Sequence, residues 1–150
     1  MREIAANAQD ANWAHPIQAN TPIEIWLPTP LTPILKIKDH GQGMTMDAIK
    51  NIFTRYGAST KRHTNEAIGG WGLGGKSPFS LTKSFQIISR DGVHCTTYVA
   101  AINTRGVPQL NVFSQKPQEP NESTGLEVHI PISDDDISSF QLNMDLFSFW

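Results

Sequence analysis

The sequence predicts an α+β domain, a two-layer sandwich in which a mainly antiparallel mixed sheet carries helices on one face. Segments with strand-like alternation outnumber helical crossovers, and they occur in adjacent pairs. The chain has 150 residues, of which 39% are hydrophobic, enough for one substantial core. We therefore expect residues 1–150 to form a single domain.

The first third of the chain predicts a helix and a hairpin. Residues 2–13 are rich in alanine and contain neither glycine nor proline, which favours a helix. Residues 23–27 and 34–38 alternate between apolar and polar side chains, and the prolines between them indicate a turn. These two segments should pair as neighbouring antiparallel strands.

The elements that follow are shorter helices and longer strands. A helix is expected over residues 46–56 with Thr45 as its N-cap, and a short one over 77–82 with Pro78 in its first turn. The expected strands cover residues 85–89, 94–102 and 126–132, with a weaker one over 110–113. Ser133 and the acidic residues after it favour a last helix over 134–147, where the aspartates complement the helix dipole rather than bind metal.

Composition restricts the partners and the compartment. The net charge of −2 and the scattered basic residues do not indicate a nucleic-acid partner. Cys95 is the sole cysteine, so no internal disulfide or CxxC zinc site is available, and a reducing cytoplasm is the simplest location. No apolar segment is long enough to span a bilayer. We expect a cytoplasmic protein, in the host cytoplasm if the source is a phage.

Residues 69–77 are rich in glycine and fit three phosphate-binding patterns. These are the dinucleotide-binding GxGxxG from Gly70, the P-loop GxxxxGK[ST] from Gly70, and a GxxGxG box from Gly69. In each, backbone N–H groups bind an anion, and Lys76 adds a positive charge. A flexible glycine-rich loop is the plain alternative.

The surroundings of the glycines favour the third pattern. The first two need a buried strand that runs directly into the glycines, whereas residues 59–66 are polar. Upstream, Glu3, Asn7 and Asp10 share one stripe of the expected helix, with small alanines around them, although a solvated face would also explain the stripe. Asp39 then opens a DxGxGM sequence directly after an expected strand.

Together these motifs resemble the GHKL ATPase superfamily, which has the Bergerat ATP-binding fold and includes chaperone ATPases, mismatch-repair proteins, gyrases and histidine kinases. The matching residues are Glu3, Asn7, Asp10 and Ala11 in ExxxNxxDA, Asp39, Gly41, Gly43 and Met44 in DxGxGM, and Gly69, Gly72 and Gly74 in GxxGxG. The sequence around residues 56–62 and 72–79 most resembles bacteriophage rIIA-like proteins.

The resemblance implies a role for each motif. Asp39 would accept a hydrogen bond from the adenine amino group, Asn7 would bind Mg²⁺, and Glu3 would act as the catalytic base toward water. Residues 57–72 would form a lid. The residues that the resemblance assigns to nucleotide binding are Asn7, Asp10, Asp39, Gly43, Met44, Lys61, Gly69, Gly72, Leu73, Gly74, Gly75, Lys76 and Thr124.

Two departures from the family pattern bear on activity. Where relatives often have a Gly-Thr pair on a late strand, this chain has Thr124 followed by Gly125, and Thr124 would substitute. Glu3 stands two residues from the start of the chain, so its helix lacks upstream support, and we expect N-terminal and C-terminal extensions of the family to be missing. Nucleotide binding is accordingly a firmer expectation than hydrolysis.

Two functions remain open at this point. The first is an ATP-binding domain with slow, magnesium-dependent hydrolysis that acts as a conformational switch, in partnership with a second copy on nucleotide binding or with a host or phage protein. The second is a non-hydrolysing nucleotide-binding or protein-interaction module, for example a phage factor that acts on a host protein. Histidine-kinase activity is not favoured, because all five histidines fall in expected loops or strands.

Overall fold

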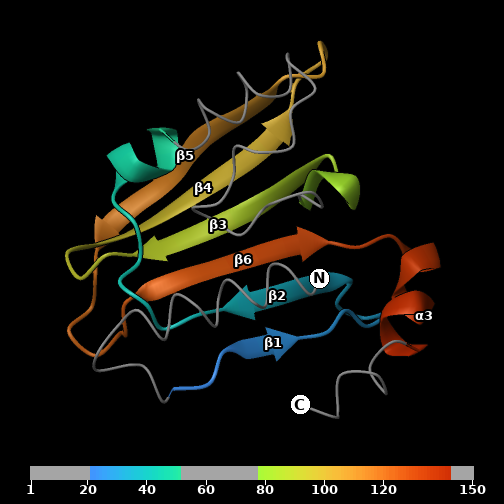
Figure 1. Cartoon of the computed structure of the whole chain (residues 1–150), viewed down its shortest axis with the longest axis horizontal. Helices are drawn as coiled ribbons and strands as arrows, with labels where there is room; N and C mark the ends of the chain where they lie inside the picture. The colour runs from blue at the N-terminus through green and yellow to red at the C-terminus, as the bar shows by residue number, and fades with distance from the viewer. Residues whose placement is uncertain (1–20, 52–77, 143–150) are drawn as a thin grey trace.

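A computed structural model describes residues 21–51 and 78–142, which form one six-stranded sheet with helical segments beside it (Figure 1). The strands are β1 (Glu24–Trp26), β2 (Ile34–Lys38), β3 (Ser84–Arg90), β4 (His94–Ile102), β5 (Pro108–Pro117) and β6 (Gly125–Pro131). The helical segments are a helix that begins at Met46 and is described to residue 51, the short 3₁₀ helix η1 (Pro78–Ser80), and α3 (Asp134–Leu142).

The strand order is β1-β2-β6-β3-β4-β5, so the last strand of the chain lies in the middle of the sheet. All five described pairings are antiparallel. By inserting between β2 and β3, β6 joins the N-terminal hairpin to the β3–β4–β5 meander. The predicted α+β class and the predicted β1–β2 hairpin are therefore confirmed.

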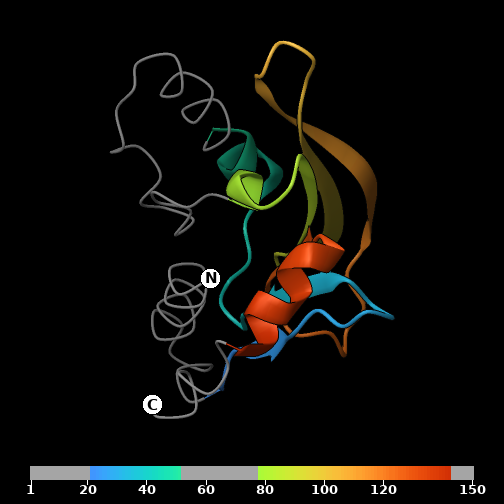
Figure 2. The ribbon, with the colours of Figure 1, turned by 90° about the vertical axis from the view of Figure 1, so that its right-hand side faces the viewer.

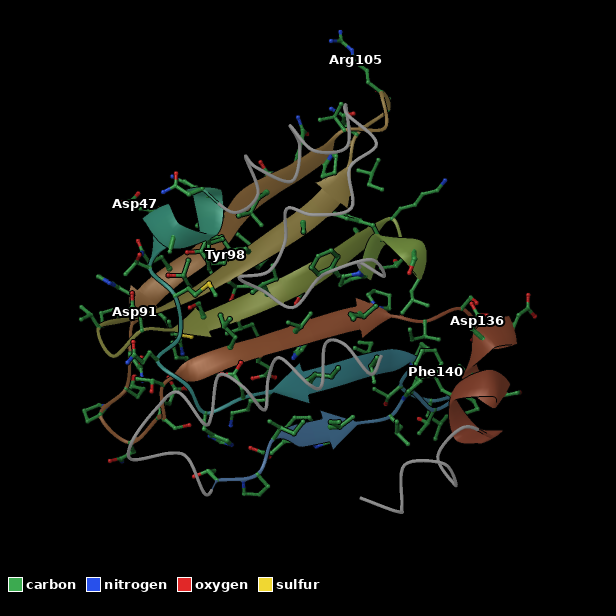
Figure 3. The ribbon with its side chains drawn as sticks, viewed as in Figure 1. Asp47, Asp91, Tyr98, Arg105, Asp136 and Phe140 are labelled. Carbon is green, nitrogen blue, oxygen red and sulfur yellow. The ribbon has the colours of Figure 1, made fainter. Side chains whose placement is uncertain are left out.

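The hydrophobic core lies on one face of the sheet. Alternate residues of the four central strands are buried there, and helical residues pack onto them: Leu35, Ile37, Phe85, Ile87, Tyr98, Ala100, Val128 and Ile130 from the strands, and Ile49, Ile137 and Phe140 from the helices. Figure 2 shows the helix after Met46 and η1 on the same side of the sheet, and Figure 3 marks Tyr98 and Phe140. The described helices thus cover a single face, as predicted.

Two helix starts have the expected caps. The Thr45 hydroxyl accepts a hydrogen bond from the Ala48 N–H at 3.4 Å, and the Thr45 carbonyl accepts the first helical bond from Ile49 at 3.1 Å. At α3, the Ser133 hydroxyl donates to Asp136 at 2.6 Å, while the Ser133 carbonyl accepts from the Asp136 N–H. Both caps satisfy polar groups that a helix end would otherwise leave unpaired.

Two elements differ in extent from the sequence expectation. The helix expected over residues 77–82 is the three-residue η1, because the Thr82 hydroxyl bonds the Ser84 backbone and starts β3 instead. The weak strand expected over 110–113 is the ten-residue β5, since pairing with β4 extends it through polar residues that show no alternation. The expected helix over 2–13 lies outside the described residues, as do the ends of those expected at 46–56 and 134–147.

The face of the sheet opposite the core carries an ionic cluster. The Glu127 carboxylate accepts a hydrogen bond from the Arg90 guanidinium at 3.1 Å and pairs with His129 two residues along β6. The hydrogen bond with His129, opposed by partial burial and supported by the charges of His129 and Arg90, lowers the pKa of Glu127 to about 2. The cluster thus ties β6 to β3 on the face opposite the core.

The lowered pKa of Glu127 predicts a pH-dependent contribution to stability. A carboxyl group whose pKa is lower in the folded state stabilises the fold above its unfolded pKa, and this contribution is lost as the pH falls through the folded pKa. We expect Glu127→Gln to lower the free energy of unfolding by about 1 kcal/mol at pH 7, allowing for solvent screening, and by progressively less between the ordinary carboxyl pKa and pH 2.

Urea denaturation of both chains across this pH range measures the difference. Glu119→Gln is the matched control, because Glu119 is exposed and its side chain makes no ion pair with the described residues. If the unfolding free energy of Glu127→Gln stays below that of the wild-type chain by the same amount down to pH 2, the electrostatic explanation is wrong.

Candidate functional site

Asp39 follows directly after β2 and is the buried centre of the candidate site. The residue is only 6% exposed. Oδ1 accepts two backbone hydrogen bonds, from Gly41 and from Leu126, both at 3.0 Å. The Asp39 N–H in turn donates to the Leu126 carbonyl at 2.9 Å. Both of these bonds end on Oδ1, and no hydrogen bond joins the described residues to the other carboxylate oxygen, Oδ2, which can therefore accept from a ligand.

Burial dominates the electrostatics of Asp39. Removal of the carboxylate from water raises the pKa of Asp39, while the N–H groups of Leu126 and Gly41 and the nearby His40 lower it in part. The buried negative charge therefore makes folding less favourable. In the same environment, a hydrogen bond from a ligand to this carboxylate is stronger than it would be in water.

Gly43 brings the loop after Asp39 into contact with β3. Its φ of 69° lies in the left-handed region, and a Cβ atom built at this position would lie 2.1 Å from the Arg90 carbonyl oxygen. The next residue is fastened by Ser89, whose hydroxyl accepts from the Met44 N–H at 2.8 Å and donates to the Met44 carbonyl at 2.7 Å. The loop backbone thus lies directly against the end of β3.

Thr124 and Gly125 approach the same loop from the start of β6. The Thr124 hydroxyl donates to the Gly41 carbonyl at 2.6 Å. Gly125 has a φ of 136°, and a Cβ atom there would lie 2.2 Å from the Asp39 carbonyl oxygen. The pair Thr124-Gly125 therefore contacts the loop from Asp39 to Gly41 directly, and the strained, close approach requires glycine at 125.

His40 links three separate segments beside Asp39. Its Nε2 atom is 2.9 Å from the Glu24 carboxylate on β1, and its Nδ1 atom is 3.1 Å from the Ser123 hydroxyl. Lys38 also pairs with Glu24, at 3.3 Å. The ring thereby joins the edge hairpin, the loop after β2 and the segment before β6.

The structure brings together four of the residues that the sequence assigns to the site. Asp39, Gly43, Met44 and Thr124 lie in two segments that hydrogen-bond one another between the ends of β2, β3 and β6. The remaining candidates lie outside the described residues, so their positions stay predictions: Glu3, Asn7, Asp10, Lys61, Gly69, Gly72, Leu73, Gly74, Gly75 and Lys76.

Sequence reasoning missed three residues that shape this site. Ser89 carries a weak signal, since it is a hydroxyl at a buried position of the alternating strand β3. Gly125 follows Thr124 just before a strand, where a glycine suggests a close backbone approach. His40 has no signal, because its contacts with Glu24 and Ser123 join it to residues that are remote in the chain.

The arrangement leaves Asp39 able to accept a hydrogen bond from a donor on a ligand. Among the described residues, no group of three or more His, Cys, Asp or Glu side chains is placed to hold a metal ion. None of the described helices has the length and apolar character needed to cross a membrane.

Comparison with known families gives a match over most of the chain. A family model described as histidine kinase-, DNA gyrase B- and HSP90-like ATPase matches residues 1–126. A comparison with curated proteins finds no match. The family match covers the DxGxGM loop, the residues outside the described part that carry the other two motifs, and the segment up to the start of β6.

The contact between Gly43 and β3 predicts that adding a single methyl group at residue 43 destabilises the fold strongly. Gly43→Ala would combine a left-handed φ with a backbone overlap at Arg90, and we expect the free energy of unfolding to fall by about 3 kcal/mol or more. Gly106→Ala is the matched control: its φ is 76°, but nothing lies within 4 Å of the added Cβ. That variant should lose only about 1 kcal/mol.

Urea denaturation of both variants measures the two costs. Equal losses at the two positions would mean that φ alone, and not the approach to Arg90, decides the requirement for glycine at residue 43.

Proposed function

The chain belongs to the histidine kinase-, DNA gyrase B- and HSP90-like ATPase family, and from this premise we propose an ATP-binding domain with slow, magnesium-dependent hydrolysis that acts as a conformational switch. ATP binding follows from the family. Hydrolysis, the metal and the switch are the proposal. The observation that supports nucleotide binding is the carboxylate of Asp39, fixed through Oδ1 by two N–H groups and left with Oδ2 for a ligand. Hydrolysis and the metal are proposed from the sequence motif that contains Glu3 and Asn7.

The proposed adenine end is the region around Asp39. Oδ2 would accept a hydrogen bond from the adenine amino group, and a guanine would present a carbonyl oxygen there instead. Two acceptors facing each other in a buried site are unfavourable, so this contact would select ATP over GTP. The backbone from Gly41 to Met44, fastened to Thr124 and Ser89, would form one wall of the adenine site.

The proposed phosphate end is carried by the glycine run, on the strength of the sequence. Backbone N–H groups of residues 72–75 would bind the phosphates, with Lys76 and Lys61 compensating their charge. An amide oxygen of Asn7 suits Mg²⁺, a hard cation that prefers oxygen ligands. Glu3 would orient or deprotonate the attacking water. A second copy of the chain that joins on nucleotide binding, or a host or phage protein, would be the partner of the switch.

Asp39→Asn tests the adenine assignment. Asparagine keeps Oδ1 for Gly41 and Leu126 but places an amino group where Oδ2 was, so that a donor would face the adenine donor. We expect the affinity for ATP to fall at least thirtyfold, about 2 kcal/mol, in titration calorimetry. Asp135→Asn, an exposed change on α3, should leave the affinity unchanged.

Thermal stability separates lost binding from lost folding. Burial raises the pKa of Asp39, so the side chain costs stability as the pH rises above the unfolded pKa of aspartate, and neutral asparagine should leave the melting temperature at pH 7 equal or higher. Unchanged ATP affinity in a folded Asp39→Asn protein would refute the adenine assignment.

Glu3→Ala tests hydrolysis separately. Removal of the proposed base should leave ATP affinity within about twofold while phosphate release falls at least a hundredfold, the range that general-base catalysis supplies. Release is measured with magnesium present and with the metal chelated, and chelation should abolish it. A wild-type chain that binds ATP yet releases no phosphate would favour the non-hydrolysing module instead.

A further inference from the structure

The strand β5 forms one outer edge of the sheet and is its longest strand, with ten residues. It pairs with β4 along one side, and in the described part of the chain no strand pairs with its other side. Figure 1 shows it at the upper margin of the sheet, and Arg105 in Figure 3 marks the tip of the turn that leads into it. An edge strand presents unpaired N–H and C=O groups in a row, which is a template for another strand.

The middle of β5 exposes apolar side chains. Phe113 is 75% exposed and Val112 is 43% exposed. Phe113 is also the extra residue of a β-bulge, since Tyr98 of β4 pairs with Val112 while Thr97 pairs with Ser114. Covering these exposed apolar side chains with a partner would remove apolar surface from water, which favours association.

Apart from the bulge, β5 lacks the features that usually block pairing at a sheet edge. Its one charged residue, Lys116, is next to last in the strand, and its prolines, Pro108 and Pro117, stand at the two ends. The eight residues between the prolines all carry a backbone N–H. Edge strands are normally protected by interior charges, by prolines within the strand or by shortness.

The opposite edge of the sheet is protected. β1 has only three residues, and one of them, Glu24, is engaged by Lys38 and His40. Pro28 follows two residues after the strand ends. Of the two edges of the described sheet, β5 is therefore the one suited to pairing.

We propose that β5 pairs with β5 of a second copy of this chain, antiparallel across a two-fold axis near Val112 and Phe113, so that the two sheets become continuous. Such an axis places residues at equal distances on opposite sides of the centre. With the axis at Val112, Lys116 faces Pro108 of the second copy, and with the axis at Phe113 it faces Leu110. The two lysines never oppose each other, and the apolar residues meet at the centre. A nearly uncharged strand suits a copy of itself better than it suits a charged peptide.

Sedimentation equilibrium of the full chain without nucleotide tests this pairing. The wild-type mass should rise from monomer to dimer with protein concentration, and Phe113→Lys should raise the dissociation constant at least tenfold, because it removes an apolar contact and brings two positive charges near the axis. Leu31→Lys is the control: Leu31 is 96% exposed but lies in the turn between β1 and β2. It should leave the association unchanged.

Three results would overturn the proposal: a wild-type chain that stays monomeric up to hundreds of micromolar, a dimer that forms only with ATP, or equal effects of Phe113→Lys and Leu31→Lys. Circular dichroism shows whether each variant is folded.

Cross-linking provides a readout that does not depend on weakening the dimer. The sole native cysteine, Cys95, is buried, so a new surface cysteine reports its own surroundings. On mild oxidation, Val112→Cys or Phe113→Cys should give a covalent dimer, because one of them lies opposite itself at the axis. If neither exceeds the yield of Leu31→Cys, the two β5 strands do not pair.

Discussion

Much of the described structure depends on one hydrogen-bonded carboxylate. Oδ1 of Asp39 accepts N–H groups from its own loop and from Leu126, which lies 87 positions later in the chain. These bonds attach the end of β2 to the start of β6, the strand that joins the two halves of the sheet. The same contact explains Gly125, since a side chain there would collide with the Asp39 carbonyl. Burial of the Asp39 carboxylate costs stability, but the contacts that bury it also hold the carboxylate in a fixed orientation in which it can accept a hydrogen bond.

The loop that begins at Asp39 is held at its far end as well. Ser89 bonds both the N–H and the carbonyl of Met44, and Gly43 lies against the Arg90 carbonyl. The backbone between these attachments is therefore positioned by two strands before any ligand arrives. Preorganisation of this kind lowers the entropy cost of binding, because the loop need not be ordered when the ligand enters.

Local pattern was sufficient for most of the described elements, but not for the order of the strands in the sheet. The strand over residues 94–102 was predicted with its observed bounds, and the DxGxGM motif located Asp39. Nothing in the alternation of β6 indicates that it inserts between β2 and β3, since that choice depends on pairing across long stretches of chain. For the same reason, the sequence does not reveal the contacts of Ser89 and His40: Ser89 stands out only weakly, as a hydroxyl at a buried strand position, and each residue bonds a partner that is remote in the sequence.

The position of the site within the sheet indicates whether nucleotide binding at Asp39 can affect self-association through β5. The loop after β2 contacts β6 and β3, whereas β5 is separated from β3 by β4, which pairs with β3 over seven residues in continuous register. A change at Asp39 would have to alter that ladder in order to reach Phe113, and a regular antiparallel ladder resists a shift because a one-residue slip reverses every side chain. Pairing at β5 should therefore be insensitive to nucleotide. An association that ATP drives would need a different surface. Measuring whether ATP changes the dissociation constant of the dimer therefore distinguishes pairing at β5 from an ATP-driven association.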